Sequence, residues 1–277
     1  MKNDRGDSGD DGVKTTISGT IRSSIGMLLL IGAGLALFVY AGYMFATQFR
    51  DYQKASRLYE DTIRECVSSN GDAEAEDPAV NWEDLVDVDL AKLRTVNEDI
   101  IGWIHFENVD ISYPVLYSGD DAKYLRKTYT GETASAGSIF MEGENNRDFS
   151  DVHTILYGHN MKDLSMFGRL KYYVKDREYI KDHAYFQIIT EHAKYRYKIF
   201  AYKVVSEDAD IYTVYRTGGP DFKAFVEDVV RRGSYSDAEE NIQENDRLIT
   251  LSTCTKEDRL VVTAVRCGES PYECVSE

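Results

Sequence analysis

The chain has 277 residues, of which 43% are apolar, and a formal net charge of −16. This length fits one domain of ordinary size together with a tail or an anchor. The strong negative charge argues against nucleic-acid binding, which needs a basic surface, and indicates a well-solvated domain instead. The 20 Tyr and 11 Phe residues favour a β-rich fold.

The N-terminal region contains an apolar stretch, Ile25–Ala46, without a charged residue. A helix needs about 20 apolar residues to cross a bilayer, whereas the apolar part of a cleaved signal peptide extends to about 15 residues. We therefore predict an uncleaved transmembrane anchor over residues 25–46, with a signal peptide as the alternative. Residues 1–24 are polar, Gly-rich and charged, which predicts a disordered tail.

The charges that flank the anchor do not orient it. Equal numbers of Lys and Arg precede and follow it: Lys2, Arg5, Lys14 and Arg22, then Arg50, Lys54, Arg57 and Arg64. The positive-inside rule therefore leaves the orientation open. Apolar residues at helical spacing over 47–66 predict a helix that leaves the membrane. An acidic linker follows, so residues 47–80 are predicted to form a helical stalk and a linker.

Residues 81–277 are predicted to form the folded domain, which begins with a short helix over 82–96. Strands are predicted over 102–107, 111–117, 137–142, 152–158, 184–190, 194–205, 247–253 and 259–266. Helices are predicted over 120–127, 165–174 and 220–233, the last with a Pro near its start and a Gly at its end. About eight strands at short spacing favour a closed barrel. The fold class is therefore mainly β, an eight-stranded closed β-barrel with N-terminal helices and a few surface helices.

The chain contains four cysteines, Cys66, Cys254, Cys267 and Cys274. They form no Cys-x-x-Cys pair, which disfavours a zinc site. In an extracytoplasmic domain Cys267 and Cys274 could form a local disulfide; inert thiols are the alternative, and the sequence does not separate the two.

Cys254 differs from the other cysteines in its position at the end of a predicted strand, where the polar turn Thr-Lys-Glu-Asp follows it. A reactive thiol needs exposure and a nearby positive charge. Arg259 begins the next predicted strand, so pairing of the two strands as a hairpin would return its side chain to the thiol. This pattern alone is weak, because most cysteines are structural.

His159 also follows a predicted strand, within the segment Tyr-Gly-His-Asn-Met. A Cys-dependent enzyme needs a His that holds a proton and returns it to a leaving amine. Cys254, His159 and Arg259 together supply a nucleophile, an acid/base and an anion stabiliser, all at strand ends where a rigid sheet fixes their geometry. His153 shares a strand face with His159, but no third ligand for a metal site is evident.

Several motifs in consistent order resemble class B sortases. They are Thr-Leu-Ser-Thr-Cys at 250–254 with Arg259 opening the next strand, Tyr-Gly-His-Asn-Met at 157–161, and the segments 99–125, 137–142, 157–173 and 220–233. The resemblance covers residues 81–266. It implies a sortase-type barrel outside the membrane, with residues 1–24 in the cytoplasm, 25–46 as the anchor and 81–277 as the catalytic domain.

The resemblance implies a transpeptidase that cleaves a sorting-signal pentapeptide of the Asn-Pro-x-Thr type, or a related one, after Thr through a thioester on Cys254. His159 would protonate the leaving amine, and Arg259 with backbone N–H groups near Thr253 would stabilise the oxyanion. The implied partners are secreted proteins with a C-terminal sorting signal and an amine of a peptidoglycan precursor or a pilin. No metal, organic cofactor or nucleic acid is implied.

The substrate contacts implied by the resemblance are Asp121, Leu125, Ser252 and Thr253. Asp121 stands where Asn is expected in the class, so its carboxylate could alter the preferred substrate. The turn between Cys254 and Arg259 is short for the class, which questions the reach of Arg259. Arg266 is the nearest rival, and strand parity places it on the opposite face. The resemblance does not explain residues 267–277.

Three alternatives stay open. Within the class, a pilin-polymerising sortase would use a pilin Lys as the nucleophile. A transpeptidase that crosslinks peptidoglycan directly keeps its His and Cys closer in sequence than His159 and Cys254. An inactive, membrane-tethered peptide-binding module is disfavoured by the presence of Cys254, His159 and Arg259 together.

Overall fold

The computed structural model describes residues 11–69, 81–236, 242–254 and 258–272, with the backbone alone at 11–25, 48, 69, 236 and 254. The chain forms two compact units, Met1–Asp51 and Tyr52–Glu277. Helix α1 (Asp11–Cys66) begins in the first unit and ends in the second.

Helix α1 contains the apolar stretch predicted to cross a membrane. Among the described residues it is the one helix long and apolar enough to do so. It begins at Asp11, before the predicted start of the anchor at Ile25 and inside the segment predicted to be disordered. Residues 1–10 of that segment lie outside the described part of the chain.

Residues 47–66 are helical, as their spacing predicts, and the last turns of α1 pack within the second unit. Buried side chains recur there every three or four residues and cover one helix face: Ala55, Tyr59, Thr62 and Cys66. Tyr59 makes the most specific contacts. Its hydroxyl donates to the Gly137 carbonyl at 2.8 Å, and its ring packs edge-on against Tyr113 with 5.3 Å between the centroids.

We expect Tyr59→Phe to lower the free energy of unfolding by about 1–2 kcal/mol, because the buried Gly137 carbonyl loses its donor. Tyr59→Ala also removes the ring and should cost about 3–5 kcal/mol. Denaturation of the full chain in detergent micelles measures both, with the exposed Tyr272→Phe as a neutral control. Equal stability of Tyr59→Phe and the wild type would show that the hydrogen bond contributes nothing.

Residues 82–96, predicted as one helix, form three elements. They are the 3-10 turn η1 (Trp82–Asp84), strand β2 (Val86–Val88) and helix α2 (Leu90–Val96). Strand β2 pairs antiparallel with β1 (Val67–Ser69). The prediction is wrong before Asp89 because alternating valines favour a strand. The Asp89 side chain then caps α2 by accepting from the Lys92 backbone N–H at 2.8 Å.

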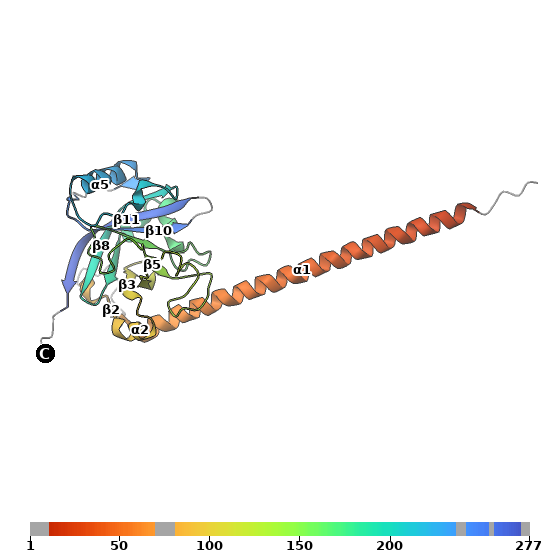
Figure 1. The fold of residues 1–277 in the computed structure, drawn as a ribbon, viewed down its shortest axis with the longest axis horizontal. Helices are drawn as coiled ribbons and strands as arrows, with labels where there is room; N and C mark the ends of the chain where they lie inside the picture. Colours follow the sequence, from red (N-terminus) through yellow and green to blue (C-terminus); the bar gives the residue numbers. More distant parts are fainter. Residues whose placement is uncertain (1–10, 70–80, 237–241, 255–257, 273–277) are drawn as a thin grey trace, which may run out of the picture. The chain divides into compact units, whose positions relative to one another are not determined.

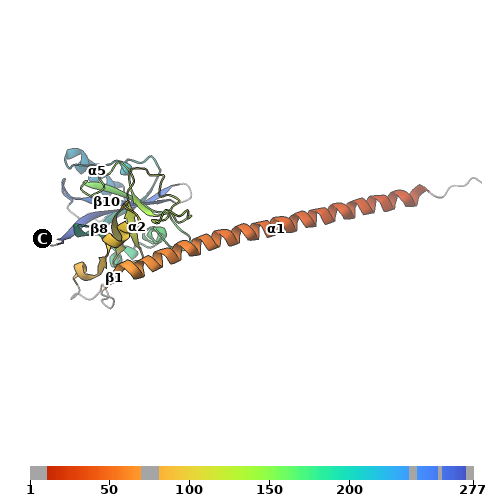
Figure 2. The same cartoon turned by 60° about the horizontal axis from the view of Figure 1, so that its bottom comes forward.

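Eight strands of the second unit close into the predicted β-barrel (Figure 1 and Figure 2). They are β3 (Ile100–Phe106), β4 (Ser112–Leu116), β5 (Ile139–Met141), β6 (His153–Tyr157), β7 (Tyr185–Ile189), β8 (Ala193–Val205), β10 (Leu248–Cys254) and β11 (Arg259–Pro271). The strand order is β11-β10-β6-β5-β4-β3-β7-β8, and the pairing of β8 with β11 closes the ring. A short strand, β9 (Tyr235–Ser236), joins the sheet by pairing with β8.

The barrel is built from antiparallel hairpins and from two parallel pairs, β4 with β5 and β6 with β10. The antiparallel hairpins are β3 with β4, β7 with β8 and β10 with β11. Strand β10 also runs parallel to β6, so two strands far apart in sequence end on the same side of the barrel. Strand β11 continues past its predicted end at Arg266, because the long β8 pairs with it as far as Pro271.

Helix α5 (Pro220–Arg232) lies beside β8, in agreement with its predicted range (Figure 1). Its buried residues Phe222, Phe225 and Val226 form a second apolar cluster with Phe200 of β8. The other helices are short: η2 (Gly168–Leu170), α3 (Lys171–Lys175), α4 (Tyr179–Asp182) and η3 (Asp210–Tyr212). The first two account for most of the helix predicted over 165–174.

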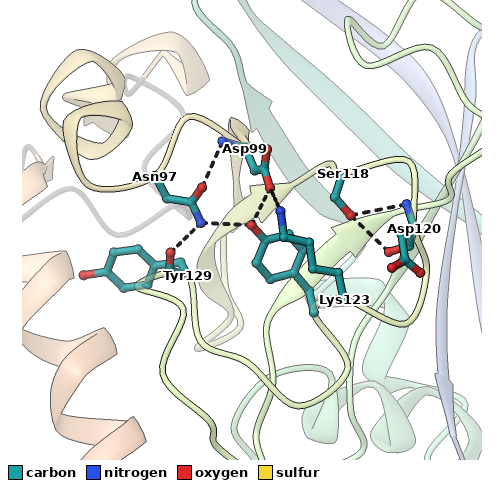
Figure 3. Close-up of polar contacts among 7 residues, drawn as sticks. Asn97, Asp99, Ser118, Asp120, Lys123 and Tyr129 are labelled. Atoms are coloured by element: carbon teal, nitrogen blue, oxygen red, sulfur yellow. Dashed lines mark hydrogen bonds and ion pairs between the residues drawn. The ribbon is translucent and has the colours of Figure 1, made fainter.

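The segment 120–127, predicted to be helical, forms a series of turns instead. The Asp120 side chain accepts the backbone N–H two residues on at 2.9 Å, a local bond that competes with a helix. The remote Asp99 carboxylate accepts from the Lys123 ammonium at 2.5 Å and from the Tyr124 hydroxyl at 2.6 Å. Figure 3 shows these bonds converging on Asp99. The helix prediction is therefore wrong, because contacts from outside the segment set its shape.

Candidate active site

The hairpin of β10 and β11 sets the relative position of Cys254 and Arg259. In the antiparallel register Cys254, the last residue of β10, is directly opposite Arg259, the first residue of β11. Directly opposite residues share one face of a sheet, and their Cβ positions lie about 4.5–5.5 Å apart. The short turn between them is thus compatible with an Arg259 that reaches position 254.

A parallel strand pair sets the position of His159. Tyr157 of β6 is aligned with Ser252 of β10. The Gly158 N–H donates to the Ser252 carbonyl at 3.1 Å, so the alignment continues past the end of β6. His159 follows Tyr157 at the same offset as Cys254 follows Ser252. Because equal offsets stay level in a parallel pair, the backbone brings His159 beside the end of β10.

A pocket of about 190 Å³ opens at these strand ends. Its lining residues are Asp121, Leu125, Phe140, Tyr157, Gly158, His159, Ser252 and Arg259. This set includes the predicted substrate contacts Asp121, Leu125 and Ser252 together with His159 and Arg259. Thr253 is outside the set. It is buried, and its hydroxyl has no hydrogen-bond partner among the described atoms.

A backbone carbonyl orients the His159 ring. The Nε2 atom of His159 lies 2.6 Å from the Leu125 carbonyl oxygen. Because a carbonyl only accepts, Nε2 carries a proton and Nδ1 is the nitrogen left for proton exchange. Gly137, at φ +58°, lies behind this carbonyl, and a Cβ there would come within 2.5 Å of the Leu125 oxygen. The sequence did not predict this hydrogen bond, because any residue can supply a backbone carbonyl. The one sequence signal was Gly137, whose missing Cβ leaves room for the Leu125 carbonyl.

The two candidate arginines have different surroundings. Arg259 lines the pocket, and its Nη2 atom lies 2.5 Å from Glu207 Oε1. The Arg266 guanidinium stacks on the Tyr195 ring at 3.9 Å from the centroid and pairs with Glu269 at 3.2 Å. Arg266 is not among the lining residues of the pocket. The geometry therefore favours Arg259 over Arg266 as the arginine of the site.

Comparison with known proteins identifies the family. The sequence profile of the Sortase domain matches residues 104–267, more than half of the chain. Sortase B of Listeria monocytogenes is 31% identical over 244 residues, which cover 86% of this chain and 92% of the relative. The chain belongs to the sortase family. Sortases are cysteine transpeptidases, so this sortase is an enzyme of that type.

Solved structures agree with the assignment of this sortase to class B. Sortase B from B. anthracis superposes with a TM-score of 0.65 at 27% identity, covering 79% of this chain and 98% of that one. A Staphylococcus aureus sortase B–substrate complex gives a TM-score of 0.60 at 27% identity, covering 64% and 83%. The predicted class B membership is confirmed.

Asp121 lines the pocket of this sortase, and the Glu142 carboxyl group lies next to it. Asp121 Oδ1 accepts from the Gly143 N–H at 2.8 Å, and the Glu142 carboxylate accepts from the Tyr157 hydroxyl at 2.6 Å. Partial desolvation, followed by hydrogen bonding to Glu142, raises the pKa of Asp121 to about 6. Asp121 therefore ionises in weakly acidic solution, so the charge that it places at the pocket depends on pH.

We expect Asp121→Asn to stabilise this sortase by about 1 kcal/mol at about pH 7.5, and by much less at about pH 4. Asp121 ionises near 3.8 in the unfolded chain and near 6 in the folded one. The wild type therefore loses stability as the pH rises through this window. The expected gain is small because solvent screens this exposed residue. Denaturation of both proteins at both pH values measures it, and a difference independent of pH would contradict the raised pKa of Asp121.

The second histidine of the β6 region has a structural role. His153 is fully buried, with Nδ1 at 2.8 Å from the Thr213 carbonyl and Nε2 at 2.8 Å from the Thr250 hydroxyl. Burial lowers the pKa of His153 to about 4. Since both of its ring nitrogens are engaged, His153 does not form a metal site with His159. Across the described part of the chain, no group of three or more His, Cys, Asp and Glu side chains is placed to hold a metal ion.

The other described cysteines lie away from the pocket. Cys66 is buried, and burial raises the pKa of its thiol, the opposite of what a nucleophile needs. Cys267 is exposed on β11, where its thiol lies 3.5 Å from the Arg196 carbonyl. Its suggested disulfide partner Cys274 is outside the described residues, so that disulfide stays a prediction.

Proposed function

We propose that this sortase cleaves a sorting-signal pentapeptide after Thr through a thioester on Cys254. The Cys254 thiolate attacks the Thr carbonyl carbon, the peptide C–N bond breaks, and the leaving amine takes a proton from His159. An amine nucleophile then attacks the thioester carbon, the C–S bond breaks, and a new amide forms. Arg259 donates hydrogen bonds to the oxyanion in both steps.

The strand register is the observation that carries this proposal. The parallel pairing of β6 with β10 and the antiparallel pairing of β10 with β11 bring positions 159, 254 and 259 to one edge of the barrel. His159 and Arg259 line the same pocket at that edge. Residues at the ends of three paired strands hold their separation better than residues on free loops, as acyl transfer requires.

The bond between His159 and Leu125 supports the acid/base role. Donation of the Nε2 proton to a carbonyl leaves Nδ1 to exchange a proton with the thiol and the leaving amine. The same carbonyl stabilises the imidazolium that forms when His159 takes the thiol proton. A carbonyl thus holds the position that a carboxylate holds in a Ser-His-Asp triad.

The pocket suggests how the sorting signal is bound. Leu125 and Phe140 offer apolar surface, while Asp121 and Ser252 offer polar groups. This mixture suits a signal of the Asn-Pro-x-Thr type, which combines the polar side chains of Asn and Thr with the apolar ring of Pro. Thr253 contributes only its backbone to the site, because its side chain is buried.

Mass spectrometry tests this function directly. The full chain in detergent micelles is incubated with peptides that carry Asn-Pro-x-Thr and related signals. We expect an acyl adduct on Cys254 and cleavage after Thr. Absence of both with every peptide would contradict the proposal and favour a membrane-tethered binding module.

The acceptor and the membrane topology are part of the same proposal. We infer that an amine of a peptidoglycan precursor resolves the thioester, so that a secreted protein becomes attached to the cell wall. Residues 25–46 anchor the enzyme in the membrane, with the N-terminus inside and the catalytic unit outside. Protease added to intact cells should then digest the catalytic unit. Faster release of product by a pilin Lys than by a peptidoglycan amine would favour pilus polymerisation instead.

A further inference from the structure

The guanidinium of Arg259 contacts an acidic residue that no motif singled out. Glu207 lies on the segment that follows β8, and its Oε1 atom is 2.5 Å from Arg259 Nη2. The closure of the barrel produces this contact. Arg259 is paired with Val205, the last residue of β8, so the residues just after β8 lie next to the start of β11.

Arg259 needs a partner to hold its side chain in one direction. An arginine side chain has about 2 kcal/mol of rotamer entropy, and Arg259 is the first residue of its strand. Its side chain is 27% exposed, so packing restrains it only in part. The guanidinium has five N–H donors in a rigid fork. A bond through Nη2 leaves Nε and Nη1 for another acceptor.

We propose that Glu207 is a positioning residue, which holds the Arg259 guanidinium at the pocket through Nη2 and leaves its other N–H groups for the substrate oxyanion. This inference rests on the oxyanion role given to Arg259 in the proposed function. Glu207 is not among the residues that line the pocket, so it acts through Arg259.

The negative charge of Glu207 has a second, opposing effect. It offsets part of the positive potential that Arg259 offers to an oxyanion. Glu207 is 68% exposed, so water and salt screen this longer-range effect. The direct contact that orients the guanidinium is screened much less. We therefore expect the orienting effect of Glu207 to exceed the electrostatic cost.

The test compares variants of the full chain in detergent micelles with a cleavable signal peptide. We expect Glu207→Ala to lower kcat by about tenfold and to change KM by less than about twofold. Glu207→Gln keeps an oxygen acceptor of the same reach and should retain kcat within about threefold. Glu269→Ala is the matched control: it removes another exposed Glu–Arg pair from β11, the one with Arg266, and should leave kcat unchanged.

A double substitution separates this inference from the proposed function. In the Arg259→Ala background, Glu207→Ala should have no further effect on kcat. If Arg259→Ala itself has wild-type kcat, the oxyanion role and this inference both fail. If Arg259→Ala is impaired while Glu207→Ala has wild-type or higher kcat, only the positioning role fails. The positioning role also fails if Glu207→Ala lowers kcat equally with and without Arg259.

Discussion

We expect Cys254→Ala to lower the rate of peptide cleavage by at least about 10⁴-fold, with no acyl adduct detectable. Removal of the nucleophile closes the two-step covalent route, and His159 and Arg259 alone cannot form the thioester. Chromatography of the peptide products measures the rate, and intact-mass spectrometry of the full chain measures the adduct. Peptide binding should persist, because the described residues that line the pocket are unchanged.

Cys267→Ala provides the matched control for this experiment. Cys267 is an exposed cysteine on the adjacent strand, and it does not line the pocket. This variant should keep wild-type activity and adduct formation. Wild-type cleavage by Cys254→Ala, or loss of cleavage in Cys267→Ala, would show that the nucleophile has been misassigned.

The second large effect is expected from Arg259→Ala, which should lower kcat by about 10²–10³-fold. Oxyanion donors act mainly in the transition state, so KM should change little. Arg259→Lys keeps the charge but loses the planar fork, and its kcat should lie between those of the wild type and Arg259→Ala. Steady-state kinetics of the three proteins with one signal peptide measures the series.

Arg266→Ala tests whether the position of the arginine matters rather than the charge alone. Arg266 lies on the same strand, stacked on Tyr195 and outside the pocket lining. Its removal should cost about 1 kcal/mol of stability through the lost cation–π contact and leave kcat unchanged. A loss of kcat in Arg266→Ala with normal kcat in Arg259→Ala would reverse the choice between the two arginines.

The barrel could be predicted because its strands carry their own local signals. The segments 184–190 and 194–205, for example, are rich in β-branched and aromatic residues and meet at a turn. Where local and remote interactions compete, the prediction fails. The segment 120–127 has helical spacing, yet Asp99 and the Asp120 side chain hold it as turns. No sequence pattern within that segment indicates a contact with the distant Asp99 carboxylate.

For the site, the residue types could be predicted from the sequence, but their arrangement in space could not. Motifs alone were enough to single out Cys254, His159 and Arg259. Their proximity depends on the parallel pairing of β6 with β10, a contact between distant strands that local sequence does not encode. The sequence does not indicate Glu207 either, because this residue contacts Arg259 only when β8 and β11 pair and close the barrel.

Leu125 has a consequence for attempts to redesign this enzyme. Leu125 lines the pocket, and its backbone carbonyl accepts a hydrogen bond from His159 Nε2. In the proposed function, exchanging the segment around Leu125 to recognise a different peptide also moves the carbonyl that orients the His159 ring, so peptide selectivity and turnover are linked through one residue. We expect grafts that keep the backbone at Leu125 and the glycine at Gly137 to change the selectivity without loss of turnover.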